Sequence, residues 1–188
     1  QCDWSSDVCS SDLPADRYDN DLTADTTTVT DPRLGGTSTV YRARLDGTPV
    51  ASLLTVVAHD GYSGDIHLLV GVTPDGTVTG VRVTQHRETP GLGDKIDLRV
   101  SKWILEFTGR ALGDPPADEW TVRKDGGAFD QFTGATITPR AVVKAVARTL
   151  DVTAERQSQW WSAAAGEAAS RLPTRTPPAT HPAETIDP

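Results

Sequence analysis

The stretch Asp130-Gln131-Phe132-Thr133-Gly134-Ala135-Thr136-Ile137-Thr138-Pro139 organises the rest of the chain. Small residues stand together in it, and Gly134 can adopt a positive φ, so the backbone can approach a ligand while the Thr136 hydroxyl stands clear. Thr138 is a good N-cap, and Pro139 suits the first position of a helix. The stretch therefore predicts a tight turn that leads directly into a helix.

The residues after this turn predict a helix with one apolar face. Apolar side chains recur near helical spacing at Val142, Val143, Val146 and Leu150. The unpaired N–H groups and the positive dipole end of such a helix favour a phosphate nearby. The residues alone leave two interpretations open: an ordinary glycine turn before a capped helix, or a site for a phosphorylated ligand.

Upstream of the turn, four segments have the composition of strands, which we place at residues 39–45, 50–58, 66–72 and 77–84. Short turns such as Asp46-Gly47 and Asp75-Gly76 separate them, which is typical of antiparallel hairpins. In the last segment, Val81 and Val83 mark the inward face. The predicted fold class is therefore α+β, with an antiparallel sheet and packed helices.

Three other segments have weaker patterns. Residues 14–30 are polar and rich in Asp and Thr, so we expect a connector. Residues 101–107 predict a short amphipathic helix whose apolar residues, Trp103, Ile104 and Phe107, pack in the core rather than against a ligand. Residues 120–124 are a candidate edge strand.

A second loop of interest, Glu88-Thr89-Pro90-Gly91-Leu92-Gly93-Asp94-Lys95, follows the last predicted strand. Its glycines and proline can expose backbone N–H groups and allow close approach to a flat ring or a phosphate. Taken alone this is a weak signal, because Pro-Gly turns are common.

The composition excludes several classes of function. A formal net charge of -8 and a pI of about 4.9 argue against a general nucleic-acid binder. No apolar run reaches the roughly 18 residues of a transmembrane helix. The four histidines are scattered in the sequence and no Gly-x-Ser-x-Gly pattern occurs, so we predict neither a metal site nor a catalytic nucleophile.

Both ends of the chain differ from its middle. Residues 1–13 hold both cysteines and resemble the translation of a sequencing-adapter oligonucleotide, so we expect them to be a non-native artefact outside the folded domain. The true N-terminus, with any membrane anchor, would then be missing. We place the domain at residues 14–152, followed at 153–188 by a helical extension and a disordered, Pro-rich tail.

The two loops resemble those of the FMN-binding domain in the RnfG (also called RsxG) and NqrC families. The pattern Asp-x-x-Thr-Gly-Ala-Thr, from Asp130 to Thr136, is similar to the flavinylation motif of these families. Gly61-Tyr62-Ser63-Gly64, Leu68-Leu69-Val70-Gly71 and the Glu-Thr-Pro-Gly-Leu-Gly loop occur in the same order as in the family. The resemblance covers roughly residues 14–149.

The resemblance implies a covalent cofactor and the residues that bind it. A flavin transferase would attach FMN through its phosphate to Thr136, and Asp130 would take part in recognition by that enzyme. The Glu-Thr-Pro-Gly-Leu-Gly loop would fold over the flavin, with Leu92 on the ring face, Glu88 and Thr89 at its polar edge and Lys95 offsetting phosphate charge. The implied cofactor-binding residues are Thr136, Thr133, Gly134, Ala135, Glu88, Thr89, Gly91, Leu92 and Lys95.

The function that the resemblance implies is electron transfer within an assembly. The chain would be the covalent-FMN subunit of a membrane-bound, ion-translocating ferredoxin:NAD oxidoreductase (Rnf) complex, working with other subunits rather than as a complete enzyme. It would lie on the periplasmic side of the bacterial inner membrane, tethered by an N-terminal helix that this chain lacks. Two alternatives are a stand-alone FMN-dependent reductase domain and a flavin-free binding or sensory module in which the threonine motif is only a helix cap.

Overall fold

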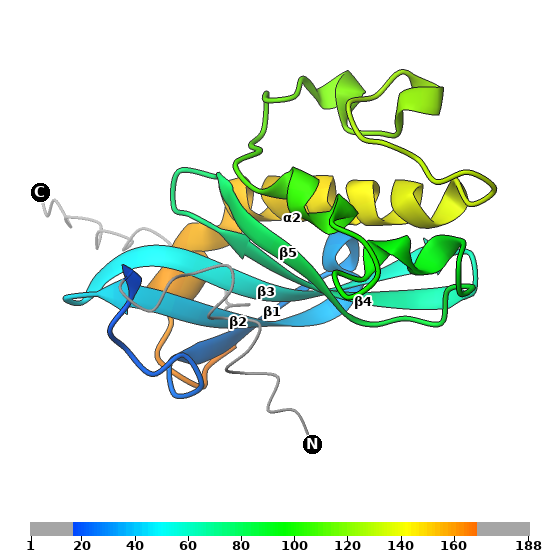
Figure 1. The fold of residues 1–188 in the computed structure, drawn as a ribbon. Coiled ribbons are helices and arrows are strands. Elements are labelled where there is room, and N and C mark those ends of the chain that lie inside the picture. Colours follow the sequence, from blue (N-terminus) through cyan, green and yellow to red (C-terminus); the bar gives the residue numbers. More distant parts are fainter. Residues whose placement is uncertain (1–16, 169–188) are drawn as a thin grey trace, which may run out of the picture.

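Five strands form one antiparallel sheet whose spatial order follows the chain (Figure 1). In the computed structural model, which describes residues 17–168, they are β1 (Thr26–Asp31), β2 (Gly36–Leu45), β3 (Thr48–Gly61), β4 (Gly64–Val72) and β5 (Val78–Gln85). Asp46 and Gly47, between β2 and β3, have φ values of 50° and 76°. A two-residue hairpin turn needs both positive values to match the twist of its strands. The antiparallel sheet and the four predicted strands are confirmed.

All but the last residue of the first strand, β1, lies in residues 14–30, which we expected to be a connector, so that part of the prediction is wrong. Its sequence is Thr-Thr-Thr-Val-Thr-Asp, and only Val29 adds an apolar side chain to the core. Threonine is β-branched and suits a strand, but a strand with one apolar residue has no alternation to detect. Antiparallel pairing with β2 makes it an edge strand of the sheet.

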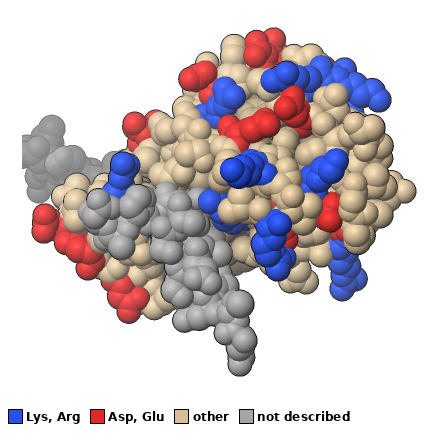
Figure 2. Space-filling view, in the orientation of Figure 1, with Lys and Arg blue, Asp and Glu red and all other residues tan. Residues whose placement is uncertain are grey.

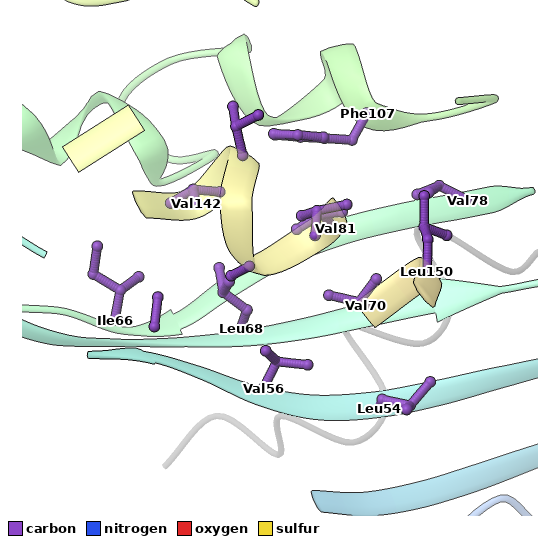
Figure 3. Packing of buried hydrophobic residues seen from close by; sticks show 14 of the residues in the cluster. Leu54, Val56, Ile66, Leu68, Val70, Val78, Val81, Phe107, Val142 and Leu150 are labelled. Carbon is purple, nitrogen blue, oxygen red and sulfur yellow. The ribbon is translucent and has the colours of Figure 1, made fainter. Parts of the chain in front are cut away.

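One long helix, α2 (Ile137–Ser162), lies across one face of the sheet (Figure 1). Val142 and Leu150 on this helix belong to the same buried cluster as Val70 and Val81 of the sheet (Figure 3). The predicted apolar face of the helix and the predicted inward face of the last strand are therefore confirmed.

Between β5 and α2 the chain forms four short 3-10 helices: η3 (Gly93–Ile96), η4 (Trp103–Phe107), η5 (Ala117–Glu119) and η6 (Arg123–Asp125). A fifth, η2 (Pro32–Leu34), precedes β2. The predicted amphipathic helix is the 3-10 turn η4, and its three apolar residues are buried as expected. The edge strand predicted at 120–124 is wrong. Val122 makes only an isolated bridge to Phe129, because breaks at Pro115-Pro116 and Gly126-Gly127 leave the segment too short to pair with the sheet.

A buried arginine fixes the far end of α2 to the sheet. Arg42 on β2 is 2% exposed, forms an ion pair with Asp25, and donates hydrogen bonds to the carbonyls of Trp160 and Ala163 at 2.7 and 2.6 Å. These carbonyls have no partner within the helix, so a buried cation is a suitable cap. The indole N–H of Trp160 donates to Ser52 Oγ at 3.0 Å, which also fixes the helix end.

The helix continues beyond residue 152, where we placed the end of the domain. Trp160 is fully buried in the core cluster. The limits of the domain remain a prediction, since the artefact proposed at residues 1–13 and the Pro-rich tail lie outside the described residues.

Candidate functional site

The loop after β5 forms a tight turn against the start of α2. The Thr89 carbonyl accepts hydrogen bonds from the N–H groups of Leu92 and Gly93, both at 3.1 Å. Gly91 has a φ of 77°, which favours glycine. Gly93 is buried, and a Cβ built on it would lie 2.8 Å from Thr138 Oγ1. Glycine is therefore required there for the loop to approach the helix.

The motif from Asp130 to Thr136, called the threonine motif below, forms a second turn beside this loop. The Ala135 N–H donates to the Phe132 carbonyl at 3.1 Å, and Gly134 has a φ of 76°. A Cβ on Gly134 would lie 3.6 Å from Leu92 Cδ2. The structure thus brings together the two loops that the sequence identified, and Leu92 and Gly134 are the residues at which they meet.

The start of α2 differs from the prediction. Thr138 is not the N-cap, and Pro139 is not the first helical residue, because the helix begins at Ile137. The cap position falls on Thr136, which has helical φ and ψ and makes no side-chain capping bond. The Thr138 hydroxyl donates instead to the Glu88 carboxylate. This tertiary contact cannot be read from a local capping pattern.

Glu88 is buried, and protein donors engage both of its carboxylate oxygens. It is 4% exposed. Oε1 accepts from the Ser63 N–H at 3.0 Å, and Oε2 accepts from the Thr138 hydroxyl. Ser63 lies in the turn between β3 and β4, so one side chain links three segments. The predicted bond from Glu88 to the polar edge of a flavin remains a prediction and would compete with these two bonds.

The remaining predicted site residues lie around the two turns. Thr136 and Ala135 are half-buried, whereas Thr133 and Thr89 are exposed. The Lys95 ammonium lies 6.0 Å from the centroid of the Phe132 ring, which places a cation beside the motif.

Aromatic residues of the core anchor the threonine motif. The Trp103 indole N–H donates to the Asp130 carbonyl at 2.9 Å, and its ring packs edge-on against Phe132 with centroids 5.1 Å apart. Asp130 itself is exposed and forms an ion pair with Arg123 at 2.9 Å. The motif backbone is thus anchored to the core, while the Asp130 side chain faces solvent.

The charges near the motif are mostly paired. Arg140 Nε lies 2.7 Å from Asp125 Oδ2, and this hydrogen bond lowers the pKa of the Asp125 carboxyl group. Burial, and then the nearby Asp130 charge, raise the pKa of Glu106. Figure 2 shows basic side chains mainly over the end with the loops after β5, where acidic side chains lie among them, while the side chains with charge at the opposite end are mostly acidic. A phosphorylated ligand at the motif would therefore lie at the more basic end of an acidic chain.

This arrangement fits a flat, phosphorylated cofactor. Two large apolar side chains at the two loops face solvent: Leu92, which approaches Gly134, is 41% exposed, and Ile137, which follows Thr136, is 45% exposed. They offer apolar surface for a ring system, and the uncapped Thr136 hydroxyl and Lys95 offer partners for a phosphate. Across residues 17–168, no group of three His, Cys, Asp or Glu side chains is arranged to hold a metal ion.

Sequence reasoning missed two members of the site. Ile137 directly follows Thr136, and this position is the signal in the sequence that indicates its place in the site. The Ser63 N–H gives no such signal, because nothing local shows that a hairpin turn 25 residues before Glu88 meets its carboxylate.

Comparisons with known proteins find one family model, several similar sequences and a similar solved structure. Residues 61–151 match the family model described as the FMN-binding domain. The RnfG protein of the ion-translocating oxidoreductase complex from Vibrio cholerae is 52% identical over 149 residues, which cover 78% of this chain and 71% of the relative. The corresponding protein of Escherichia coli is 58% identical over 137 residues, covering 72% and 66%. Among solved structures, the NqrC protein of the Na⁺-translocating NADH-quinone reductase from Parabacteroides distasonis matches with a TM-score of 0.48 and 19% identity, covering 77% of this chain and 69% of that one.

Proposed function

Because this chain belongs to the RnfG family of ion-translocating oxidoreductase complexes, we propose that it is the covalent-FMN electron carrier of such a complex. The observation that carries the proposal is the meeting of two loops beside Thr136. Leu92 approaches Gly134 from one loop, and the Thr136 hydroxyl is left without a capping role in the other. A ring lying on Leu92 and a phosphoester at Thr136 would use both features.

The chain's own residues hold the cofactor and shield it only in part. Leu92 and Ile137 provide apolar contact, Gly134 allows close approach, and Lys95 offsets charge. FMN supplies the one- and two-electron redox chemistry, and protein contacts tune its potential. A covalent link prevents the cofactor from dissociating in any redox state. The exposure of Leu92 and Ile137 keeps this end accessible to a partner protein.

Attachment requires a second protein. A threonine hydroxyl is a weak nucleophile and does not take a phosphate unaided, so a flavin transferase would form the bond. Asp130 suits recognition by that enzyme because its carboxylate is exposed while its backbone is anchored through Trp103. Thr133, Gly134 and Ala135 leave little bulk beside the acceptor residue.

The two alternative functions have less support. A reductase acting on its own substrate needs an acid–base residue over the flavin, and the buried Glu88 carboxylate is already engaged by Ser63 and Thr138. A flavin-free module would use the threonine motif as a helix cap, but neither Thr136 nor Thr138 caps α2.

The proposed place of action is the periplasmic side of the bacterial inner membrane, within a complex of several proteins. Family membership supports the association with a membrane, since the relatives are named as members of an ion-translocating complex. None of the helices in the described part of the chain, residues 17–168, is long and apolar enough to span a membrane.

The test is whether flavin stays on the protein after unfolding. The chain is expressed with and without a flavin transferase, denatured, and freed of small molecules by gel filtration. We expect about one flavin per chain, seen by absorbance and fluorescence, only in the sample made with the transferase. Protein without bound flavin in both samples would contradict the proposal. Turnover of a nicotinamide substrate by the isolated flavoprotein would instead support the stand-alone reductase.

A further inference from the structure

A buried carboxylate links the three segments that surround the proposed flavin. Glutamate is rarely this buried unless its charge is compensated, yet Glu88 is 4% exposed. Its two donors are neutral, namely the Ser63 N–H in the β3–β4 turn and the Thr138 hydroxyl in the first turn of α2. The positive dipole end of this 26-residue helix also favours a negative charge at that point.

The backbone around Glu88 is equally constrained. Its own N–H donates to His86 Nδ1 at 3.0 Å. Gly93 packs onto the Glu88–Thr138 pair so closely that a Cβ on it would lie 2.8 Å from Thr138 Oγ1 and 3.0 Å from Glu88 Cβ. The loop between Glu88 and Gly93 therefore has both ends fixed against the same hydroxyl group.

This link joins the two halves of the flavin site. Thr138 comes two residues after Thr136 in the same helical turn, and Leu92 comes one residue before Gly93. A change in the bond between Glu88 and Thr138 must therefore alter how Leu92 lies relative to Thr136. The same bond also occupies the hydroxyl of Thr138, which is 1% exposed, whereas Thr133 and Thr136 are more accessible.

We propose that Glu88 is the positioning residue of the flavin site. It acts through Thr138 and the loop from Glu88 to Gly93 to hold Leu92 over a cofactor attached at Thr136. The inference rests on the proposed function, because it concerns the same site. It assigns Glu88 a role different from a bond to the flavin edge, because its carboxylate oxygens link the β3–β4 turn to the first turn of α2. It also explains why Thr138 is not an acceptor for FMN, since its hydroxyl is buried and already donated.

The test compares two changes that break the same bond with one that breaks an unrelated bond. Glu88→Met keeps roughly the length of the side chain and removes both acceptor oxygens, while Thr138→Val removes the hydroxyl and keeps the shape. Thr149→Val is the matched control, because Thr149 is also buried on α2 and its hydroxyl donates to the Ala145 carbonyl at 2.8 Å. Each variant is made with a flavin transferase and analysed for thermal unfolding, flavin content by mass, visible spectrum and midpoint potential.

We expect Glu88→Met and Thr138→Val to yield folded proteins whose bound flavin has absorption bands shifted toward those of free FMN. Their midpoint potential should move by about 30 mV or more, which is a tenfold change in relative binding of the two-electron oxidised and reduced forms. The double variant should shift no further than Glu88→Met alone, because Thr138→Val then removes a hydroxyl that has already lost its acceptor. Thr149→Val should lower thermal stability and leave the spectrum and potential unchanged.

Folded variants that lose flavinylation would also support positioning, since Thr136 itself is intact in them. If Glu88→Met does not fold, Thr138→Val decides the question alone. Wild-type flavin content, spectrum and potential in folded Thr138→Val would overturn the inference while leaving the proposed function standing. A wild-type protein that takes no flavin would instead remove the proposed function.

Discussion

Two glycines with positive φ make it possible to measure a loss of stability separately from a loss of contact with the flavin. Gly134 has a φ of 76° in the threonine motif, and Gly76 has a φ of 92° in the turn between β4 and β5. A Cβ on Gly76 would meet nothing within 4 Å, whereas a Cβ on Gly134 would lie 3.6 Å from Leu92 Cδ2. Gly134→Ala and Gly76→Ala therefore impose the same backbone penalty, but only the first adds a methyl group between the two flavin loops.

The magnitude follows from this geometry. A left-handed backbone costs a residue with a Cβ about 1–2 kcal/mol. Ordinary van der Waals contact with Leu92 adds little, because 3.6 Å is not a clash. The reduced freedom of the unfolded chain returns about 0.4–1 kcal/mol, so both variants should lose roughly 1 kcal/mol. In a domain of this size that loss corresponds to a fall in Tm of about 2–4 °C.

Thermal unfolding and the visible spectrum of the flavinylated proteins measure the two effects separately. Gly76→Ala and Gly134→Ala should have similar Tm values, and only Gly134→Ala should show an altered flavin spectrum or reduced flavin content. A normal flavin spectrum in Gly134→Ala, with the expected fall in Tm, would refute the argument that the cofactor lies against the contact between Leu92 and Gly134.

Three further predictions concern single side chains. Arg42→Met should lower the free energy of unfolding, measured by chemical denaturation, by about 3–5 kcal/mol, because it leaves the partners of Arg42 unpaired. A loss below about 1 kcal/mol would contradict the claim that Arg42 fixes the end of α2 to the sheet. Hydrogen bonds from Arg33 lower the pKa of Asp31 from 3.8 to about 2 in the folded protein. The ionised Asp31 carboxylate therefore contributes its full share of stability above the pKa of the unfolded chain, and this share is lost as the pH falls through the pKa of the folded protein. Asp31→Asn should thus cost about 2 kcal/mol at neutral pH and almost nothing near pH 2, whereas a loss independent of pH would exclude this explanation. Asp130→Ala should lower the rate of flavinylation while changing stability by less than about 1 kcal/mol, as for an exposed ion pair; an unchanged rate would argue against recognition through Asp130.

The sheet was largely predictable because its signals are local. The strands that the sequence predicted have apolar residues near their centres and turn residues such as Asp46-Gly47 at their ends. The strand it missed, β1, is made mostly of threonine, and its place is decided by hydrogen bonds to β2 rather than by its own pattern. The segment at 120–124 shows the opposite error, since Trp-Thr-Val suits a strand but found none to pair with.

The site was predictable as a set of loops but not as a set of contacts. Both loops could be identified from their glycines and from the family resemblance. Which residues meet was not readable, because the bond between Glu88 and Thr138 joins positions 50 residues apart. That contact also explains the error at the start of α2: Thr138-Pro139 has the local signature of a cap, but the tertiary partner takes the hydroxyl.

The most direct test of the central claim is the mass of the peptide that carries Thr136. Trypsin should release residues 125–140 as one peptide, because Lys124 and Arg140 bound it. After co-expression with a flavin transferase, we expect this peptide to gain the mass of one FMN less one water. Fragmentation should place the addition on Thr136 rather than on Thr133 or Thr138, and Thr136→Ala should remove it. Covalent FMN on another residue, or its retention in Thr136→Ala, would contradict the account.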